Sequence, residues 1–580
     1  MMNNNSANTD RLATTTCHLT DPQPCSSWPH PGIRKILLLA VGLSWLLAGV
    51  WTSPATADEK SPPSPATSSA AAGNAKGIVF HDQDGDRKRD DGEPGLSGIR
   101  VSNGRDIVVT SADGSYQLPI TDDTILFVIK PRGWRTPISD KQLPEFYYIH
   151  KPHGSPASKF AGVAPTGPLP ESVDFPLYPQ DEPDQFKAIL FGDPQPRDQK
   201  EVDFIAHDVI DSLIGSDAAF GVTLGDIVFD NLALFESQAR AVALIGIPWY
   251  NVIGNHDMNY DAPHDRLSDE TFERHFGPAY YSFDHGPVHF LVLDDVRWFI
   301  ADGKTEGEYE GGLGPEQMAF IRRDLEMIPP DQLVVLMMHI PLVDVQDRHE
   351  LYRLIEQRPF CLSISAHRHI HQHIFIDDKD GWRGPQPHHH LVNVTVCGGW
   401  WSGQKDERGI PHTLMPDGAP NGHSVIRFDG HQYALDFLPA GRPADYQMNI
   451  YLPEAIEVGK VAGTELKVNV FNGSSKSQVM ARVVGAGADW KPLEYAPGDD
   501  PAFAAIATQE SSIRTAVADK PAVLESLGVA LPKIGVSAHL WQGQVGQELP
   551  AGNYLLEVRT IDMHGQQLDS RRTFRVIPAH

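Results

Sequence analysis

The chain has 580 residues, with 48 Lys or Arg against 75 Asp or Glu, and its formal net charge is −27. This length predicts about three or four domains, each able to bury its own core. So acidic a chain argues against nucleic acid and anionic membrane surfaces as partners, because both require a basic face on the protein. A phosphorylated substrate stays compatible, since bound cations reverse the local field.

The beginning of the chain has the pattern of an export signal. Arg34 and Lys35 precede an apolar run at residues 36–50, and Ala55-Thr56-Ala57 offers a small-x-small cleavage site. We therefore predict a signal peptide at residues 1–57 and a mature protein that is periplasmic or secreted, with no stable membrane span after cleavage. The alternative is a retained N-terminal anchor, although the run is short for a membrane span. Residues 58–75 are rich in Ser, Pro and Ala, which predicts a flexible linker.

Residues 76–180 have the short strands of a β-sandwich, with a hairpin signal at Asp113-Gly114. Within this region an acidic run follows the first strand. Its members occupy places one, three, five, nine and twelve of a twelve-residue loop, which is the donor spacing of an EF-type calcium loop: Asp82, Asp84, Asp86, Asp90 and Glu93. Arg87 replaces the usual Gly at the sixth place, and the stretch resembles the calcium-binding β-sandwich repeats of bacterial surface proteins. Both a calcium site and a solvated acidic turn fit this pattern.

The middle of the chain carries polar clusters that each follow an apolar, often β-branched run. In chain order they are Asp193-Pro194-Gln195, Gly225-Asp226, Gly254-Asn255-His256-Asp257, His339-Ile340-Pro341 and His367-Arg368-His369. This pattern places each cluster on a loop at the C-terminal end of a buried strand, where one sheet edge brings such loops together. Helices are predicted between the strands, one capped by Asp198 and another opened by Pro315.

The chemistry of these clusters indicates a metal centre. Carboxylate, amide and imidazole donors without a thiolate suit divalent Mn, Fe, Zn, Ni or Co. The donors exceed the needs of one ion, so the economical arrangement is two ions bridged by Asp226 and a hydroxide. Such a pair activates water and neutralises phosphoryl oxygens, which predicts hydrolysis of a phosphomonoester or a phosphodiester without deciding between them.

The same clusters resemble the calcineurin-like metallophosphoesterases over roughly residues 185–375. The resemblance implies a four-layer α/β/β/α core and a ligand set for each ion. The first ion would take Asp193, Asp226 and His369, and the second would take Asp226, Asn255, His339 and His367. His256 would stabilise phosphoryl charge or protonate the leaving alkoxide, oriented by Asp257. Gln195 stands where the family usually has His, and we interpret it as a variant metal ligand.

The remaining residues, 381–580, are predicted to form a β-rich C-terminal domain. With the N-terminal sandwich, they resemble the C-terminal domain of an exported bacterial branch of the family. Trp400, Trp401 and Asn421 are predicted either to wall the substrate cleft or to form a buried anchor and a turn. The triplet at residues 388–390 is predicted to be a solvated loop, with a cleft contact as the alternative. The end of the chain alternates like an immunoglobulin-type sandwich.

The sequence thus predicts a multidomain α+β protein, with domains at residues 76–180, 185–380 and 381–580. The predicted function is an exported metal-dependent phosphoesterase acting on a phosphorylated small molecule, lipid or glycan. The alternative is a non-catalytic envelope binding protein with a degenerate phosphoesterase domain, and Gln195 is its best support.

Overall fold

The computed structural model describes residues 73–304, 307–485, 487 and 489–579. The predicted signal peptide and most of the predicted linker lie outside these ranges. Strand β1 begins at Gly73, so the last three residues of the predicted linker belong to the sandwich. Among the described helices, none combines the length and the apolar character needed to cross a bilayer.

The N-terminal region consists of two four-stranded sheets. Alternate residues of β4 (Ser115–Ile120) are buried, as expected for a strand with one face on a core. The first sheet has the order β4, β1 (Gly73–His81), β8 (Phe175–Pro179), β6 (Trp134–Arg135), and the second β3 (Ile107–Val109), β2 (Arg100–Ser102), β5 (Thr124–Ile129), β7 (Tyr147–His150).

The first sheet of the central core has parallel strands at one side and a hairpin at the other. Its order is β11 (Trp249–Val252), β10 (Phe220–Leu224), β9 (Gln185–Phe191), β20 (Gly422–Asp429), β21 (Gln432–Pro439). The side chains of β9 alternate between two cores. Ala188 and Leu190 pack between the sheets, whereas Ile189 and Phe191 pack with helices α1 (Gln199–Asp208) and α2 (Phe235–Ala243).

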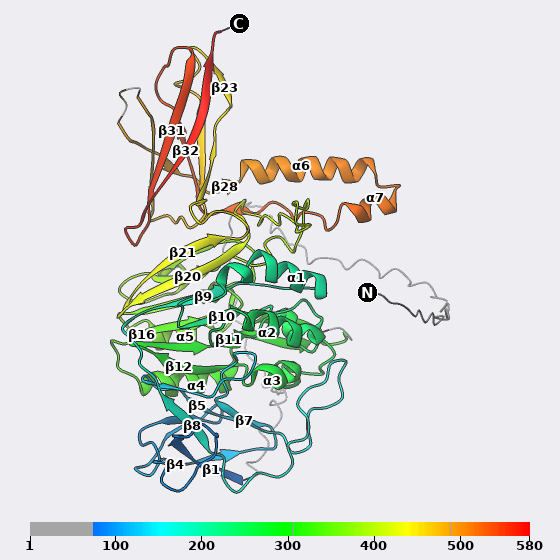
Figure 1. The fold of residues 1–580 in the computed structure, drawn as a ribbon, viewed down its shortest axis with the longest axis vertical. Helices are drawn as coiled ribbons and strands as arrows, with labels where there is room; N and C mark the ends of the chain where they lie inside the picture. Colours follow the sequence, from blue (N-terminus) through cyan, green and yellow to red (C-terminus); the bar gives the residue numbers. More distant parts are fainter. Residues whose placement is uncertain (1–72, 305–306, 486, 488, 580) are drawn as a thin grey trace, which may run out of the picture. The chain divides into compact units, whose positions relative to one another are not determined.

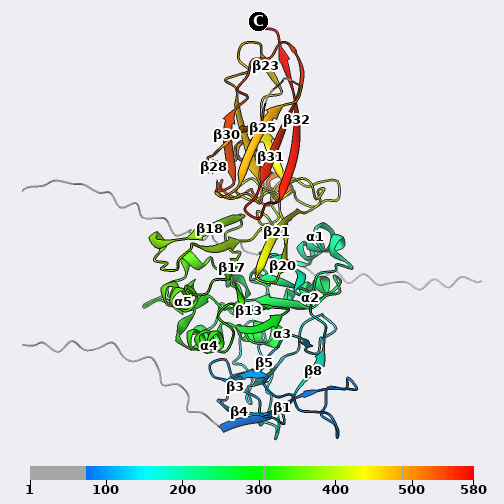
Figure 2. The ribbon, with the colours of Figure 1, turned by 90° about the vertical axis from the view of Figure 1, so that its left-hand side faces the viewer.

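The second core sheet has the order β12 (Tyr281–His285), β13 (Val288–Val292), β16 (Leu333–Met337), β17 (Cys361–Ser365), β19 (His388–Val392), β18 (Gln372–Ile376). Apolar residues of α4 (Gly314–Glu326) and α5 (Arg348–Ile355) share its core. Figure 2 shows α4 and α5 on one side of the paired sheets and α1 and α2 on the other. The predicted four-layer α/β/β/α core is therefore confirmed. The predicted helix starts also hold, because the side chain of Asp198 accepts from the Glu201 backbone N–H and Pro315 lies in the first turn of α4.

The core extends further along the chain than the predicted boundary at residue 380. Strand β19 pairs with β17, and β20 pairs antiparallel with β9, so residues 388–439 complete both core sheets (Figure 1). The triplet predicted as a solvated loop forms β19, where His388 and His390 are buried and both contact the Ser363 hydroxyl, at 2.8 and 2.7 Å. That prediction is wrong, because pairing with β17 buries this segment.

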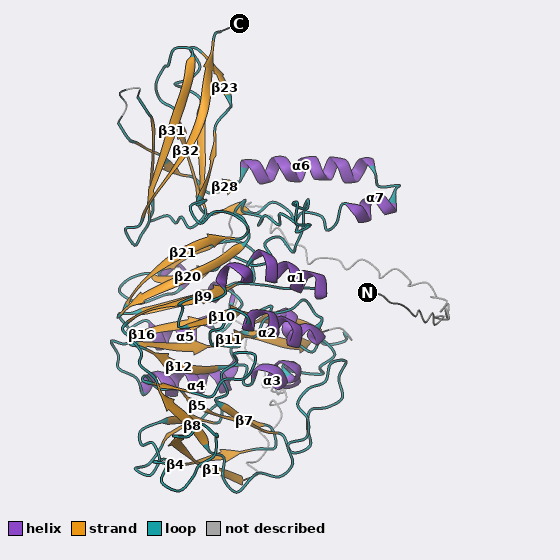
Figure 3. Ribbon diagram, viewed as in Figure 1, coloured by secondary structure: helices purple, strands orange, loops and turns teal. Residues whose placement is uncertain are grey.

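A second sandwich follows at residues 448–577. Its sheets are β22 (Met448–Tyr451), β24 (Glu465–Val470), β30 (Leu540–Gln544), β27 (Glu494–Tyr495), and β23 (Ala455–Glu457), β32 (Gln567–Ile577), β31 (Gly552–Ile561), β25 (Gln478–Val483), β26 (Lys491–Pro492). Between the paired strands β28 (Gly498–Asp499) and β29 (Val536–Ser537) lie helices α6 (Pro501–Ala516) and α7 (Pro521–Ser526), the helical insertion in this β-rich region (Figure 3).

Candidate metal centre

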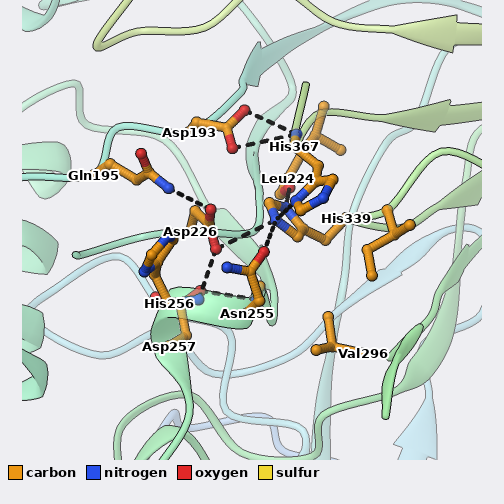
Figure 4. A network of polar contacts seen from close by, with 12 residues as sticks. Asp193, Gln195, Leu224, Asp226, Asn255, His256, Asp257, Val296, His339 and His367 are labelled. Carbon is orange, nitrogen blue, oxygen red and sulfur yellow. Dashed lines mark hydrogen bonds and ion pairs between the residues drawn. The ribbon is translucent and has the colours of Figure 1, made fainter. Parts of the chain in front are cut away.

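The five predicted polar clusters lie on loops that directly follow strands β9, β10, β11, β16 and β17. Because these strands run parallel within each sheet, their loops emerge at one edge and the side chains converge (Figure 4). Several of these residues have left-handed backbone angles that non-glycine residues seldom adopt: Asp193, Gln195, Asp226, His367 and His369. Such strain is concentrated at functional sites.

One group of donors surrounds the Nε2 atom of His339. This atom lies 3.2 Å from Asp226 Oδ1, 3.1 Å from Asn255 Oδ1 and 3.2 Å from His367 Nδ1. The other ring nitrogen, Nδ1, lies 2.9 Å from the Leu224 carbonyl oxygen and donates to it, so Nε2 is the ring nitrogen that faces the group. Asp226, His339 and His367 each offer a ligand atom, and these atoms lie within 4.8 Å of one another.

A second group lies around Asp193. Both of its carboxylate oxygens accept from the His367 backbone N–H, and its Oδ1 lies 3.8 Å from His369 Nε2. His369 Nδ1 donates to the Gly398 carbonyl at 2.7 Å, which again directs Nε2 inward. Gln195 is buried, and its amide Nε2 donates to Asp226 Oδ2. The structure therefore brings all seven predicted metal residues together, with Gln195 in contact with the central carboxylate.

The protonation of His367 and His369 suits divalent cations. Burial lowers the pKa of His367 to about 3 and that of His369 to about 4, so both rings are neutral donors at neutral pH. Burial opposes the ionisation of Asp226, but the neighbouring His339 and His256 outweigh it and lower its pKa. Metal binding requires ionised carboxylates and neutral imidazoles. The oxygen and nitrogen donors present fit two ions of the Mn, Fe, Zn, Ni or Co type.

His256 lies beside this group and is held by a different carboxylate from the one predicted. Its Nδ1 lies 2.7 Å from Asp230 Oδ1, and its backbone N–H donates to Asp226 Oδ1 at 2.9 Å. Burial would lower the pKa of His256, but the charges of Asp226 and Asp230 outweigh it and raise the pKa.

The carboxylate of Asp257 instead accepts from three backbone N–H groups, those of Ile227, Val228 and Gly254, at 2.9 to 3.1 Å. The prediction that Asp257 orients His256 is therefore wrong. Asp257 joins the loop after β10 to the loop after β11, and it is fully buried.

The three residues predicted to wall a cleft have separate roles. The ring of Trp400 stacks on that of His369, with centroids 4.0 Å apart. Trp401 is 2% exposed, and Asn421 donates its side-chain amide to Asp208 Oδ2 at 2.9 Å and to the Val396 carbonyl at 3.1 Å. Of these three residues, only Trp400 contacts a predicted metal residue. The prediction that Trp401 and Asn421 wall a cleft is therefore wrong, and both are buried structural residues, as the alternative predicted.

Sequence reasoning missed several residues that contact the site. Asp295 is fully buried, and its Oδ1 accepts from the backbone N–H groups of His339 and Ile340, both at 3.0 Å. The hydroxyl of Tyr260 donates to the Asn255 carbonyl at 2.7 Å. The Tyr309 ring lies edge-on to that of His367, with centroids 6.2 Å apart. Asp295 carries the same signal as the predicted clusters, since it follows the apolar run of β13.

The acidic loop of the N-terminal sandwich also gathers its predicted residues. Ligand atoms of Asp82, Asp84 and Glu93 lie within 4.8 Å of one another, as do those of Asp84, Asp86 and Asp90. Arg87 has φ of 68°, the left-handed conformation for which calcium loops use Gly at this place. Backbone N–H groups of the loop also donate to Asp82 and Glu93, so both interpretations of the sequence fit the geometry.

Two family models match the regions on either side of this site. Residues 83–163 match the N terminal of calcineurin-like phosphoesterase, and residues 390–568 match the C terminal of calcineurin-like phosphoesterase. The chain is similar to "Probable glycerophosphodiester phosphodiesterase GpdQ" of Arcobacter nitrofigilis, with 29% identity over 112 residues. The match covers 19% of this chain and 37% of the relative, so the chain spans little more than a third of that relative's length.

Two solved structures are similar to parts of the chain. The purple acid phosphatase PPD1 from yellow lupin (Lupinus luteus) seeds is 12% identical, with a TM-score of 0.32, over 59% of this chain and 66% of that chain. Phosphopantetheinyl hydrolase PptH from Mycobacterium tuberculosis is 13% identical, with a TM-score of 0.22, over 36% of this chain and 88% of that chain.

Proposed function

The chain belongs to the calcineurin-like phosphoesterase family, and on this premise we propose that it hydrolyses a phosphodiester with the help of two divalent metal ions. The observation that carries the proposal is the convergence of inward-facing imidazole and carboxylate atoms from five strand-end loops. Bound there, the two ions would supply a hydroxide nucleophile at neutral pH and neutralise the phosphoryl oxygens.

The positions of the donors support one assignment of the ligand residues to the two ions. Asp193 and His369 would hold one ion and Asn255, His339 and His367 the other, with Asp226 shared between them. Gln195 contacts the shared carboxylate through its amide nitrogen, so we assign it the positioning of Asp226 in place of the predicted ligand role.

His256 is the proposed general acid. The two neighbouring carboxylates raise its pKa, which favours the protonated ring that a leaving alkoxide requires. Asp230 holds Nδ1 and thereby directs the other ring nitrogen away from this carboxylate. His256 remains 21% exposed in its side chain, so a substrate can reach it.

A diester is favoured over a monoester by the charges that border the site. Arg197 and Arg368 lie within two residues of predicted metal residues in the sequence, and each is paired with a carboxylate, Glu201 and Asp344 respectively. Neither is left to balance a second negative charge. A phosphodiester carries one negative charge at neutral pH, whereas a monoester approaches two.

Export and calcium binding are further parts of the proposal. The N-terminal pattern supports a periplasmic or secreted enzyme acting on a phosphorylated small molecule, lipid or glycan. N-terminal sequencing of the mature protein should then begin at Asp58, and a chain that keeps Arg34 would contradict export with cleavage. The acidic loop at residues 82–93 is proposed to bind calcium.

The decisive experiment measures metal content and turnover on the purified chain. We expect bound transition metal, and hydrolysis of bis(p-nitrophenyl) phosphate in Mn²⁺ that exceeds hydrolysis of p-nitrophenyl phosphate. Chelation should abolish both activities, and Asp226→Asn should do the same because it removes the shared carboxylate. A folded protein with neither metal nor turnover would favour the non-catalytic binding protein instead.

A further inference from the structure

Four aromatic side chains surround the candidate metal centre: Phe229, Tyr260, Tyr309 and Trp400, which we call the aromatic collar. They come from four separate segments. Phe229 follows β10, Tyr260 follows the short helix Asn255–Asp257, Tyr309 lies in β15 (Gly307–Gly311), and Trp400 follows β19. Only Trp400 was predicted near the site from the sequence, because the other three become its neighbours only in the folded chain.

Each collar residue contacts a different member of the site. Phe229 stacks on the His256 ring with centroids 4.2 Å apart, and Trp400 stacks on His369 at 4.0 Å. Tyr309 lies edge-on to His367 at 6.2 Å, and the Tyr260 hydroxyl donates to the Asn255 carbonyl. The four rings therefore border the general acid and ligands of both proposed ions.

Two residues of the collar, Tyr260 and Tyr309, are held by a buried neighbour and are also exposed to solvent. The ribbon formed by β14 (Val296–Ile300) and β15 pairs Tyr309 with Trp298, which is 2% exposed. Tyr260 packs edge-on against this same Trp298, with ring centroids 5.1 Å apart. Tyr260 and Tyr309 nonetheless remain 39% and 37% exposed, although most large aromatic side chains of the described ranges are buried. A supported but exposed ring beside a reaction centre is a surface that a ligand can cover.

The side chains of the collar determine which kind of ligand group binds to it. Its members offer π faces and edges, and the two arginines beside the site are already paired with Glu201 and Asp344. Aromatic rings favour other flat rings in stacked or edge-on contact beyond what apolar area alone provides. A saturated ring of the same size buries similar area but lacks this contact.

We propose that the aromatic collar binds a flat aromatic ring attached close to the phosphoryl group of the substrate, so that the substrate class is a phosphodiester that carries such a ring. This inference rests on the proposed function, because the phosphoryl group must sit at the metal centre for the ring to reach the collar. The phosphodiester and the ring are then recognised by separate parts of one site.

The test compares two ligands that differ only in the flatness of the ring. Methyl phenylphosphonate and methyl cyclohexylphosphonate both carry one negative charge, and calorimetry on the Mn²⁺-loaded protein measures their affinities directly. We expect the phenyl compound to bind roughly three- to tenfold more tightly. Tyr309→Ala should remove most of this preference, whereas Tyr309→Phe should keep it because the ring remains.

Tyr495→Ala is a matched control, since Tyr495 is also 37% exposed but lies in the C-terminal sandwich. It should leave the preference unchanged, and thermal unfolding establishes that each variant is folded. Equal affinities of the two ligands, or a preference that survives Tyr309→Ala, would overturn the collar. Equal loss in Tyr309→Phe and Tyr309→Ala would also overturn it, by placing the effect in the hydroxyl.

The two levels of the proposal fail separately. Absence of bis(p-nitrophenyl) phosphate turnover in the same preparation counts against the proposed hydrolase, while calorimetry still measures the ring preference. Turnover together with equal ligand affinities counts against the collar alone.

Discussion

The buried His289 predicts that the protein loses stability as the pH rises toward 9 and above. Its Nδ1 lies 2.7 Å from Asp284 Oδ1 and its Nε2 lies 2.9 Å from Asp324 Oδ2, and the side chain is fully buried. Arg100 of the N-terminal sandwich pairs with both carboxylates, at 2.8 and 2.7 Å. The network therefore joins the sandwich to the second core sheet. Its charge balance depends on whether His289 is protonated.

The magnitude follows from the pKa of His289. Burial alone would lower this pKa, but the charges and hydrogen bonds of Asp324 and Asp284 outweigh burial and raise it from 6.5 to about 9. At about 1.4 kcal/mol for each pKa unit, the shift corresponds to about 3 kcal/mol of folding stability. A raised pKa stabilises the fold fully below the unfolded-state value of 6.5. The contribution is lost as the pH rises through about 9.

The assay compares the free energy of unfolding of the wild type and His289→Gln from about pH 6 to about pH 10. The wild type should lose about 3 kcal/mol more than the variant over this range. His423→Gln is the control, because burial lowers the pKa of His423 to about 4 and the ring in the folded protein stays neutral throughout the window. Parallel pH profiles for the wild type and His289→Gln would show that the His289 proton does not stabilise the fold.

Three further outcomes are expected. Asp230→Asn should lower kcat by about 10²- to 10⁴-fold in steady-state assays of bis(p-nitrophenyl) phosphate, since it removes the carboxylate that holds His256; unchanged kcat would exclude Asp230 from this role. Trp401→Ala should cost about 3 to 5 kcal/mol in thermal or denaturant unfolding, because the ring is 2% exposed, and a cost near zero would contradict its role as an anchor. Asp86→Ala should abolish the rise in unfolding temperature with Ca²⁺ and leave turnover unchanged; a calcium response equal to wild type would argue for the solvated turn.

The sequence predicts most of the centre because each donor directly follows a buried strand. That rule is local, and it places Asp193, Asp226 and His339 correctly from the apolar runs before them. It does not reveal which strand lies beside which. Strands β20 and β21 join the first core sheet through antiparallel pairing with β9, across more than two hundred residues of chain, so the predicted end of the core at residue 380 came too early.

There is also a definite physical reason why Asp230, and not the predicted Asp257, holds the His256 ring. The turn at Asn255–Asp257 is a single 3₁₀ turn, and the side chain of its third residue, Asp257, reaches back to the Gly254 backbone N–H as at a helix N-terminus. The ring of His256 leaves this turn on the other side, where the left-handed residue Asp230 meets it. Adjacency in sequence suggested one partner, and the direction of the side chains selects the other.

The strained backbone of the centre and the charges gathered there both oppose folding of the metal-free protein. Asp193, Asp226 and His367 adopt left-handed angles that cost about 1 to 2 kcal/mol each in an L-residue. Burial also raises the pKa of Asp193 well above its usual range, so ionising it beside Asp226 is unfavourable in the metal-free protein. Both costs oppose folding, and divalent cations at this point would offset them by neutralising the carboxylates. Metal loading should therefore stabilise this region of the protein and not only activate it.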